Sequence, residues 1–252
     1  MFKQILTGLV CFVFGFASLV NAENITFESN SKTVDGKPLM LAGVLKKPGG
    51  DGPFPAVVLL HGCAGWRGRN IEWFSKLVNW GYVALQVDSF GPRNESNICY
   101  SSNEEWVIWR MKGAQDAHDA KNYLAQLSFI DKNRIAVIGW SYGGMAAIQT
   151  IDKSTEIKNR GNPFKAAIAF YPYCYTKLEN FESPLLILIG ELDKVVPAAL
   201  CQKQMVSETS IPEVVLKIYP GAKHQFESSL KYSELAADAL EQVKSFLTKH
   251  MQ

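Results

Sequence analysis

The sequence has little net charge and few of the residues that bind metals. Its 26 lysine and arginine residues nearly balance 24 aspartate and glutamate residues, so the formal net charge is only +2. This balance gives no reason to expect nucleic acid or an anionic membrane as a partner. The chain has four histidines and five cysteines, with no Cys-x-x-Cys pair and no Cys/His cluster at zinc-ligand spacing. We therefore expect neither a metal nor another cofactor.

The sequence also lacks internal repeats, low-complexity segments and any change of composition that would mark a second domain. Hydrophobic residues make up 47% of the 252 residues and charged residues 20%, which is ordinary for a globular protein. A chain of this length can bury one sizeable core. We therefore expect a single folded domain.

The N-terminal apolar stretch is too short for an ordinary membrane span. A lysine near the start precedes an apolar run over residues 5–20, and Val20-Asn-Ala22 fits the small-residue rule for signal-peptide cleavage. A span needs about 20 apolar residues. We expect residues 1–22 to be a signal peptide and residues 23–252, beginning at Glu23, to be exported to the periplasm or secreted. An uncleaved membrane anchor is the alternative.

Four cysteines lie beyond the expected signal peptide, namely Cys63, Cys99, Cys174 and Cys201. An even number of cysteines in an exported protein indicates two disulfides. Each cysteine comes shortly after an expected strand or the loop that follows one, and neighbouring strands favour the pairs Cys63–Cys99 and Cys174–Cys201. Other pairings, and buried free thiols, remain open.

Strands and helices alternate along the chain beyond residue 53. The expected strands are 25–28, 39–46, 56–60, 82–87, 134–139, 166–171, 184–190 and 214–219, and the expected helices are 71–80, 104–127, 145–151 and 233–249. Continuous apolar strands that alternate with helices predict an α/β fold, with a mostly parallel sheet covered on both faces. The first two strands are expected at an antiparallel edge. The gap over residues 172–183 is too short for a large lid.

The most informative motif is Gly139-Trp-Ser141-Tyr-Gly143, which follows a buried strand and precedes small, helix-compatible residues. This is the form of a nucleophile elbow, a tight strand-to-helix turn that exposes one serine Oγ. The two glycines are expected because a Cβ at either position would meet the neighbouring backbone. We interpret Ser141 as a catalytic nucleophile, although a glycine-rich turn without chemistry has the same pattern.

Two further residues follow Ser141 in the order serine, acid, histidine that this architecture uses. Asp193 lies on the loop after the apolar strand 184–190, with Glu191 as the competing acid, and His224 follows the strand 214–219. Catalytic groups of α/β sheets gather at such strand ends. His224 would take the serine proton as general base, and Asp193 would orient the imidazole.

The oxyanion of an acyl-transfer intermediate needs two hydrogen-bond donors. Tyr142 N–H is one candidate because it opens the helix after Ser141. The second is expected in the loop after the strand 56–60, where we assign Cys63 N–H, with Ala64 as the alternative. We expect His61, which begins the same loop, to brace it through a structural hydrogen bond.

Five segments carry a family resemblance. They are Leu59-Leu-His-Gly-Cys-Ala-Gly65, Val87-Asp-Ser-Phe-Gly-Pro-Arg93, Gly139-Trp-Ser-Tyr-Gly-Gly144, Leu188-Ile-Gly-Glu-Leu-Asp193 and Gly221-Ala-Lys-His224. Their order and spacing resemble the dienelactone hydrolase family of α/β-hydrolases. The resemblance implies hydrolase chemistry on esters or lactones. The enzyme that gives the family its name uses a cysteine nucleophile, whereas position 141 here is serine, so the resemblance does not carry over the dienelactone substrate.

Several residues near the expected site are candidates for substrate contact. The main candidates are Trp66, Arg93 and Tyr173, with Arg67, Arg69, Phe90 and Tyr175 close to them in sequence. Arg93 could hold a substrate carboxylate, but an ion pair that braces its loop is the alternative. On the helix 104–127, Trp106 and Trp109 are expected to pack against neighbours and His118 to face solvent.

Together these features predict an exported serine hydrolase that cleaves small carboxylic esters or lactones. One alternative is a prolyl oligopeptidase-like peptidase, which shares this core. The other is a catalytically idle hydrolase fold that serves as a binding module.

Overall fold

The computed structural model describes residues 22–66, 71–205 and 212–252. The expected signal peptide lies outside the described residues except for its last position, as do Arg67 and Arg69. Among the described helices, none has both the length and the apolar character needed to cross a membrane.

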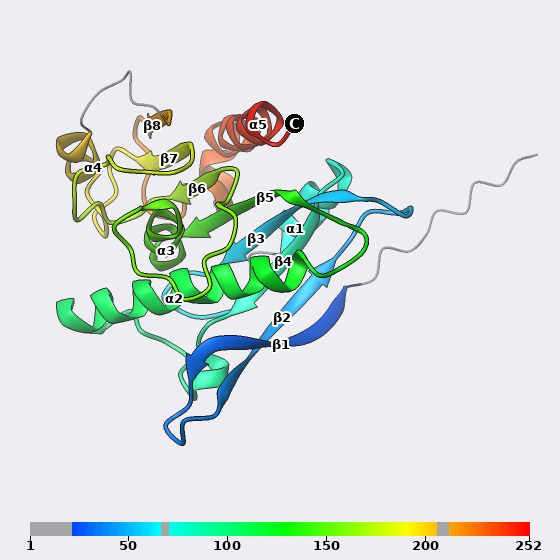
Figure 1. Ribbon diagram of the computed structural model, residues 1–252. Coiled ribbons are helices and arrows are strands. Elements are labelled where there is room, and N and C mark those ends of the chain that lie inside the picture. The colour runs from blue at the N-terminus through cyan, green and yellow to red at the C-terminus, as the bar shows by residue number, and fades with distance from the viewer. Residues whose placement is uncertain (1–21, 67–70, 206–211) are drawn as a thin grey trace, which may run out of the picture.

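One sheet of eight strands forms the centre of the domain (Figure 1). The strands are β1 (Glu23–Lys32), β2 (Pro38–Lys46), β3 (Phe54–Leu60), β4 (Val83–Asp88), β5 (Ile130–Trp140), β6 (Ala167–Phe170), β7 (Leu185–Gly190) and β8 (Val214–Tyr219). Their order across the sheet is β1-β2-β4-β3-β5-β6-β7-β8. β2 pairs antiparallel with β1 and β4, and the remaining neighbours pair parallel. The expected mostly parallel sheet with an antiparallel edge is confirmed.

Helices cover both faces of this sheet. They are α1 (Ile71–Asn79), α2 (Asn103–Leu124), α3 (Tyr142–Ile151), α4 (Ala198–Gln204) and α5 (Ser233–His250). α2 and α3 pack against each other on one face, and α1 and α5 lie on the other (Figure 1). β7 is buried along its whole length, as expected for a strand that is covered on both sides. The chain therefore has the predicted α/β fold.

Close packing of α2 on α3 holds the beginning of α3 in place. A Cβ at Gly113 would lie 2.6 Å from the Oη of Tyr142 and 2.9 Å from the Cβ of Ala146, so glycine at this position lets the two helices approach. Tyr142 Oη donates a hydrogen bond to the carbonyl of Trp109 at 3.0 Å. The residue directly after Ser141 is thereby tied to α2.

The prediction that His118 faces solvent is wrong. Its side chain is fully buried (0% exposed), because this part of α2 packs against the end of α3 and the segment that follows it. His118 Nε2 lies 2.9 Å from the carbonyl of Thr150, and Nδ1 lies 3.1 Å from the carbonyl of Arg160. Burial, together with the nearby charge of Lys121, lowers the pKa of His118 to about 3. His118 is therefore a neutral structural residue.

The short helix α4 was not expected from the sequence. It follows Pro197 and contains Cys201, whose disulfide and buried position fix it against the connection after β6. That connection, residues 171–184, is described in full and contains no helix, which agrees with the expected lack of a large lid.

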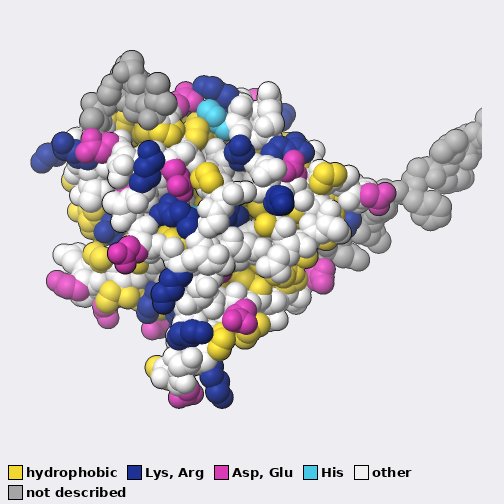
Figure 2. Space-filling model, in the orientation of Figure 1, with side chains coloured by type: hydrophobic (Ala, Val, Ile, Leu, Met, Phe, Trp, Pro, Cys, Tyr) yellow, Lys and Arg dark blue, Asp and Glu magenta, His cyan; other side chains and the backbone are white. Residues whose placement is uncertain are grey.

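The surface carries charges of both signs. On the face shown in Figure 2, lysine and arginine side chains are interspersed with aspartate and glutamate side chains. Partly exposed ion pairs such as Lys249–Glu213, at 2.8 Å, contribute roughly 0–1 kcal/mol each. The surface thus agrees with the near balance of charge in the sequence.

Candidate active site

Ser141 lies on a tight turn between β5 and α3. Its backbone has φ 54° and ψ −110°, which is unusual for a residue with a side chain. A Cβ at Gly139 would overlap the carbonyl of Gly143, and a Cβ at Gly143 would overlap the carbonyl of Leu60. Glycine is therefore required on both sides of Ser141. This geometry matches the nucleophile elbow expected from the motif.

His224 and Asp193 form a direct hydrogen bond at the ends of two neighbouring strands. Nδ1 of His224 donates to Oδ2 of Asp193 at 2.6 Å. The other carboxylate oxygen, Oδ1, accepts from the backbone N–H groups of Val195 and Val196, at 2.9 Å each. The Asp193 side chain is buried, so each carboxylate oxygen has a fixed role. One holds the turn of the loop, and the other orients the imidazole.

Glu191, the competing acid, has a different partner. Its Oε2 accepts from the backbone N–H of Gly221 at 2.9 Å. This hydrogen bond joins the loop after β7 to the loop after β8. The structure therefore pairs Asp193, and not Glu191, with His224.

The ring of Tyr171 packs against His224 from another side. The centroids of the two rings are 4.4 Å apart. Tyr171 Oη donates to Oε1 of Glu227 at 2.5 Å, which links the end of β6 to the loop that carries His224. The imidazole is thus held by a carboxylate and by an aromatic ring.

A cavity of about 1000 Å³ lies at the carboxyl edge of the sheet, next to the loops that carry these residues. Ser141 and His224 both border it, together with Cys63 and Tyr173. The sequence separates these positions widely, and parallel strands bring them to one edge because the carboxyl ends of such strands point the same way.

Trp66 and Arg93 do not border the described part of this cavity. Arg93 donates hydrogen bonds to both carboxylate oxygens of the buried Asp116, at 2.8 and 2.9 Å, and to the carbonyl of Ser89 at 2.7 Å. Burial raises the pKa of Asp116, and the Arg93 guanidinium opposes that shift. Arg93 therefore braces its loop, as the alternative interpretation held, and its guanidinium is already occupied.

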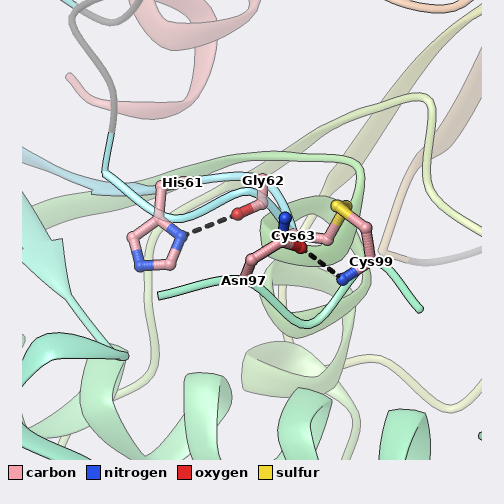
Figure 3. The surroundings of a disulfide bond; sticks show 5 residues. All are labelled: His61, Gly62, Cys63, Asn97 and Cys99. Carbon is pink, nitrogen blue, oxygen red and sulfur yellow. Dashed lines mark hydrogen bonds between the residues drawn. A yellow bond between two sulfur atoms is a disulfide. The ribbon is translucent and has the colours of Figure 1, made fainter. Parts of the chain in front are cut away.

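Tyr142 and Cys63, the two residues expected to supply oxyanion donors, lie on either side of the Ser141 turn in the chain's fold, one at the start of α3 and one in the loop after β3. Tyr142 begins α3, so its N–H has no acceptor within the helix. Cys63 follows β3 in the loop that borders the cavity. His61 steadies this loop. Its Nδ1 lies 2.8 Å from the carbonyl of Gly62 (Figure 3), and its Nε2 accepts from Ser89 N–H at 3.2 Å. Burial lowers the pKa of His61, which favours this neutral, structural role.

Both expected disulfides are present at this edge of the sheet. The Cα atoms of Cys63 and Cys99 are 4.9 Å apart, and those of Cys174 and Cys201 are 5.0 Å apart. Figure 3 shows the first disulfide directly beside the loop of His61 and Gly62. The carbonyl of Cys63 also accepts from Ile98 N–H at 2.9 Å. The loop after β3 is thus fastened by a covalent bond and by a backbone hydrogen bond.

The cavity has an aromatic border that the sequence revealed only in part. Tyr173 and Tyr175 were expected near the site, and both border the cavity. Trp106 was expected to pack on a helix neighbour, but it borders the cavity as well. A tryptophan near the start of a helix can pack against the core or line a cavity, and the sequence carries no signal that separates these two roles.

Comparison with known proteins gives a family match over most of the chain. The model of the dienelactone hydrolase family matches residues 41–251. A provisionally assigned carboxymethylenebutenolidase of Saccharolobus solfataricus is 24% identical over 245 residues, which cover 79% of this chain and 91% of that protein. A provisionally assigned dipeptidyl-aminopeptidase B of Grosmannia clavigera is 35% identical over 95 residues, which cover 36% of this chain but only 9% of the peptidase.

Among solved structures, the dienelactone hydrolase from Anabaena variabilis aligns with a TM-score of 0.66. The two sequences are 17% identical, and the alignment covers 92% of this chain and 99% of the other. At this identity the likeness shows a shared fold.

Proposed function

This chain belongs to the dienelactone hydrolase family of α/β-hydrolases, and from that premise we propose that it is an exported serine hydrolase of small esters or lactones. Ser141 is the proposed nucleophile, His224 the general base and Asp193 the residue that orients the histidine. The observation that carries the proposal is the 2.6 Å hydrogen bond between Asp193 and His224, together with the cavity that both His224 and Ser141 border.

The proposed reaction has two halves. Ser141 Oγ attacks the carbonyl carbon of the ester while His224 Nε2 takes the hydroxyl proton. His224 then gives this proton to the leaving alcohol as the carbon–oxygen bond breaks, and an acyl group remains on Ser141. A water molecule, deprotonated by His224, hydrolyses the acyl-enzyme and restores the serine.

Hydrogen bonds to the developing oxyanion would supply much of the rate enhancement. Tyr142 N–H and Cys63 N–H are the proposed donors, with Ala64 N–H as the alternative to Cys63. Loss of one such donor lowers kcat by about 10²–10³-fold in other serine hydrolases. The bracing of the Cys63 loop by the disulfide to Cys99 supports this assignment, because oxyanion donors must be held in place before the reaction.

The two disulfides also bear on where the enzyme works. Disulfides persist in oxidising compartments such as the periplasm and the extracellular space. Their presence supports the proposal that residues 1–22 direct export and that residues 23–252 form the mature enzyme.

A peptidase is the second candidate. The local identity of 35% to a dipeptidyl-aminopeptidase favours it, although the match covers only a small part of that protein. The same serine chemistry cleaves amides and esters, so the substrate preference must be measured.

A fluorophosphonate probe tests the proposal, because an activated serine displaces its fluoride. We expect one adduct on Ser141 in the native protein, no adduct after acid denaturation, and no adduct in Ser141→Ala. Hydrolysis of p-nitrophenyl acetate should fall to the background rate in the same variant. Native protein that forms no adduct would favour an idle binding module. Faster cleavage of dipeptidyl p-nitroanilides than of esters would favour the peptidase.

A further inference from the structure

Three half-buried aromatic side chains border one side of the cavity. Trp106 comes from the beginning of α2, and Tyr173 and Tyr175 come from the connection after β6. We call these three residues the aromatic wall. All three pack against a buried cluster that consists of Phe90, Ile98, Tyr142 and Met145. The wall is therefore attached to the residue after Ser141 and to the loop of the first disulfide.

The aromatic wall is held in place before any ligand binds. The ring centroids of Tyr173 and Tyr175 are 4.3 Å apart, so each tyrosine supports the other. The guanidinium carbon of Arg110 lies 4.9 Å from the centroid of the Tyr175 ring, at cation–π distance. A fixed aromatic surface binds a flat ligand at low entropic cost, because its side chains are already ordered.

The side of the cavity near His224 has a more mixed border, where the ring of Tyr171 lies beside polar side chains. The loop that follows His224 contributes polar side chains to the border, namely Gln225, Glu227, Ser228 and Ser229. In the proposed mechanism His224 protonates the leaving alcohol, so the alcohol must lie beside this polar loop. The acyl group then extends away from His224. A cavity of about 1000 Å³ has room for both parts of such an ester.

On the basis of the proposed function, we infer that the enzyme prefers esters whose acyl group carries an aryl ring, with that ring stacked on the aromatic wall. Stacked and edge-to-face ring pairs are favourable beyond the area that they bury, by an amount that corresponds to about two- to tenfold in affinity. A saturated ring of the same size buries similar area but lacks this interaction. The aromatic wall thus selects rings by their flat π faces as well as by size.

Two matched pairs of esters test this inference. Methyl 3-phenylpropanoate and methyl 3-cyclohexylpropanoate share a leaving group and differ only in the acyl ring. Benzyl acetate and cyclohexylmethyl acetate place the same difference in the alcohol. We expect kcat/KM, measured by pH-stat titration of the released acid, to favour the aromatic acyl ester about fivefold or more. The alcohol pair should differ less than twofold.

Substitutions in the aromatic wall should remove the preference. Tyr173→Leu, Tyr175→Leu and Trp106→Leu are each expected to lower the ratio of the acyl pair toward one. Because both esters are measured on the same sample, this ratio is independent of the fraction of protein that folds. Tyr100→Leu is the matched control, since Tyr100 is 95% exposed and does not border the described cavity, and it should keep the wild-type ratio.

Several results would overturn the inference and leave the proposed function intact. One is a ratio near one in wild-type protein whose hydrolysis still requires Ser141. Another is a preference that persists in all three wall variants, and a third is a preference seen only in the alcohol pair. A fourth is wild-type protein that hydrolyses p-nitrophenyl acetate through Ser141 but none of the four esters. Unchanged hydrolysis in Ser141→Ala would instead refute the proposed function.

Discussion

The substitution Asp193→Asn should remove most of the activity without disturbing the fold. In the native protein, Oδ1 of Asp193 accepts two backbone N–H groups and Oδ2 accepts from His224. An asparagine has only one side-chain oxygen. That oxygen must stay with the N–H groups of Val195 and Val196, because an NH₂ group in its place would face two donors. The NH₂ group of the asparagine would therefore point at Nδ1 of His224.

This arrangement forces the wrong tautomer on His224. Nδ1 must then accept a hydrogen bond, so the proton of the neutral imidazole moves to Nε2, which can no longer take the proton of Ser141. In a serine protease the equivalent change lowers kcat about 10⁴-fold. That corresponds to about 5.4 kcal/mol of transition-state stabilisation at 1.36 kcal/mol per factor of ten. We expect a loss of about 10³–10⁴-fold here, with little change in the fold.

The assay is kcat for p-nitrophenyl acetate, with circular dichroism as the check on folding. Glu191→Gln is the matched control, because Oε1 of a glutamine can still accept from Gly221 N–H, and its kcat should stay within about threefold of wild type. Retention of more than a tenth of the activity by Asp193→Asn would refute the reasoning. An equal loss in Glu191→Gln would reassign the acid.

Two further predictions concern stability. Replacing Cys63 and Cys99 together by alanine, or Cys174 and Cys201 together, should lower the unfolding free energy by about 3–4 kcal/mol in either case, because the closed loops have similar lengths of 36 and 27 residues. Only the first pair should also reduce kcat at a temperature where both proteins are folded, and an equal effect on kcat would contradict the role given to the Cys63 loop. The pKa of His118 falls from about 6.5 in the unfolded chain to about 3 in the folded one, so the unfolded state binds more protons between these values and stability should decline as the pH drops below about 6.5. At pH 4 the unfolding free energy should be lower by about 3 kcal/mol on account of His118. Urea titrations should show a steeper change of the unfolding free energy with pH in wild type than in His118→Gln; equal changes would show that the pKa of His118 is not lowered in the folded state.

The sequence predicted the sheet and the position of the site for a specific reason. Most of the parallel strands are largely apolar runs, and β7 is wholly apolar. Ser141, Asp193 and His224 each follow such a run, so their order and their place at one edge could be predicted without side-chain geometry. The cysteine pairs were predictable on the same ground, because they lie near the same strand ends.

The helix α2 shows why other features could not be predicted. Residues 113–121 are buried although many of them are polar. Their partners come from distant parts of the chain: Arg93 binds Asp116, Ser29 donates to Asp119, and the carbonyl of Thr150 meets His118. In the sequence, a polar stretch of this kind looks like the solvent face of a helix. Trp106 on the same helix packs against a buried cluster as predicted, but its place at the border of the cavity also depends on distant segments and was not predicted.

The two disulfides have a consequence for biosynthesis. The four cysteines beyond residue 22 pair consecutively along the chain. The first, Cys63, is bonded to the second, Cys99, and the third, Cys174, to the fourth, Cys201, so the two covalent loops do not interleave. A chain that enters an oxidising compartment from its N-terminus presents these cysteines one after another. An oxidase that joins each newly emerged pair would produce the native linkages directly. Maturation of this protein would then need an oxidant but no disulfide isomerase.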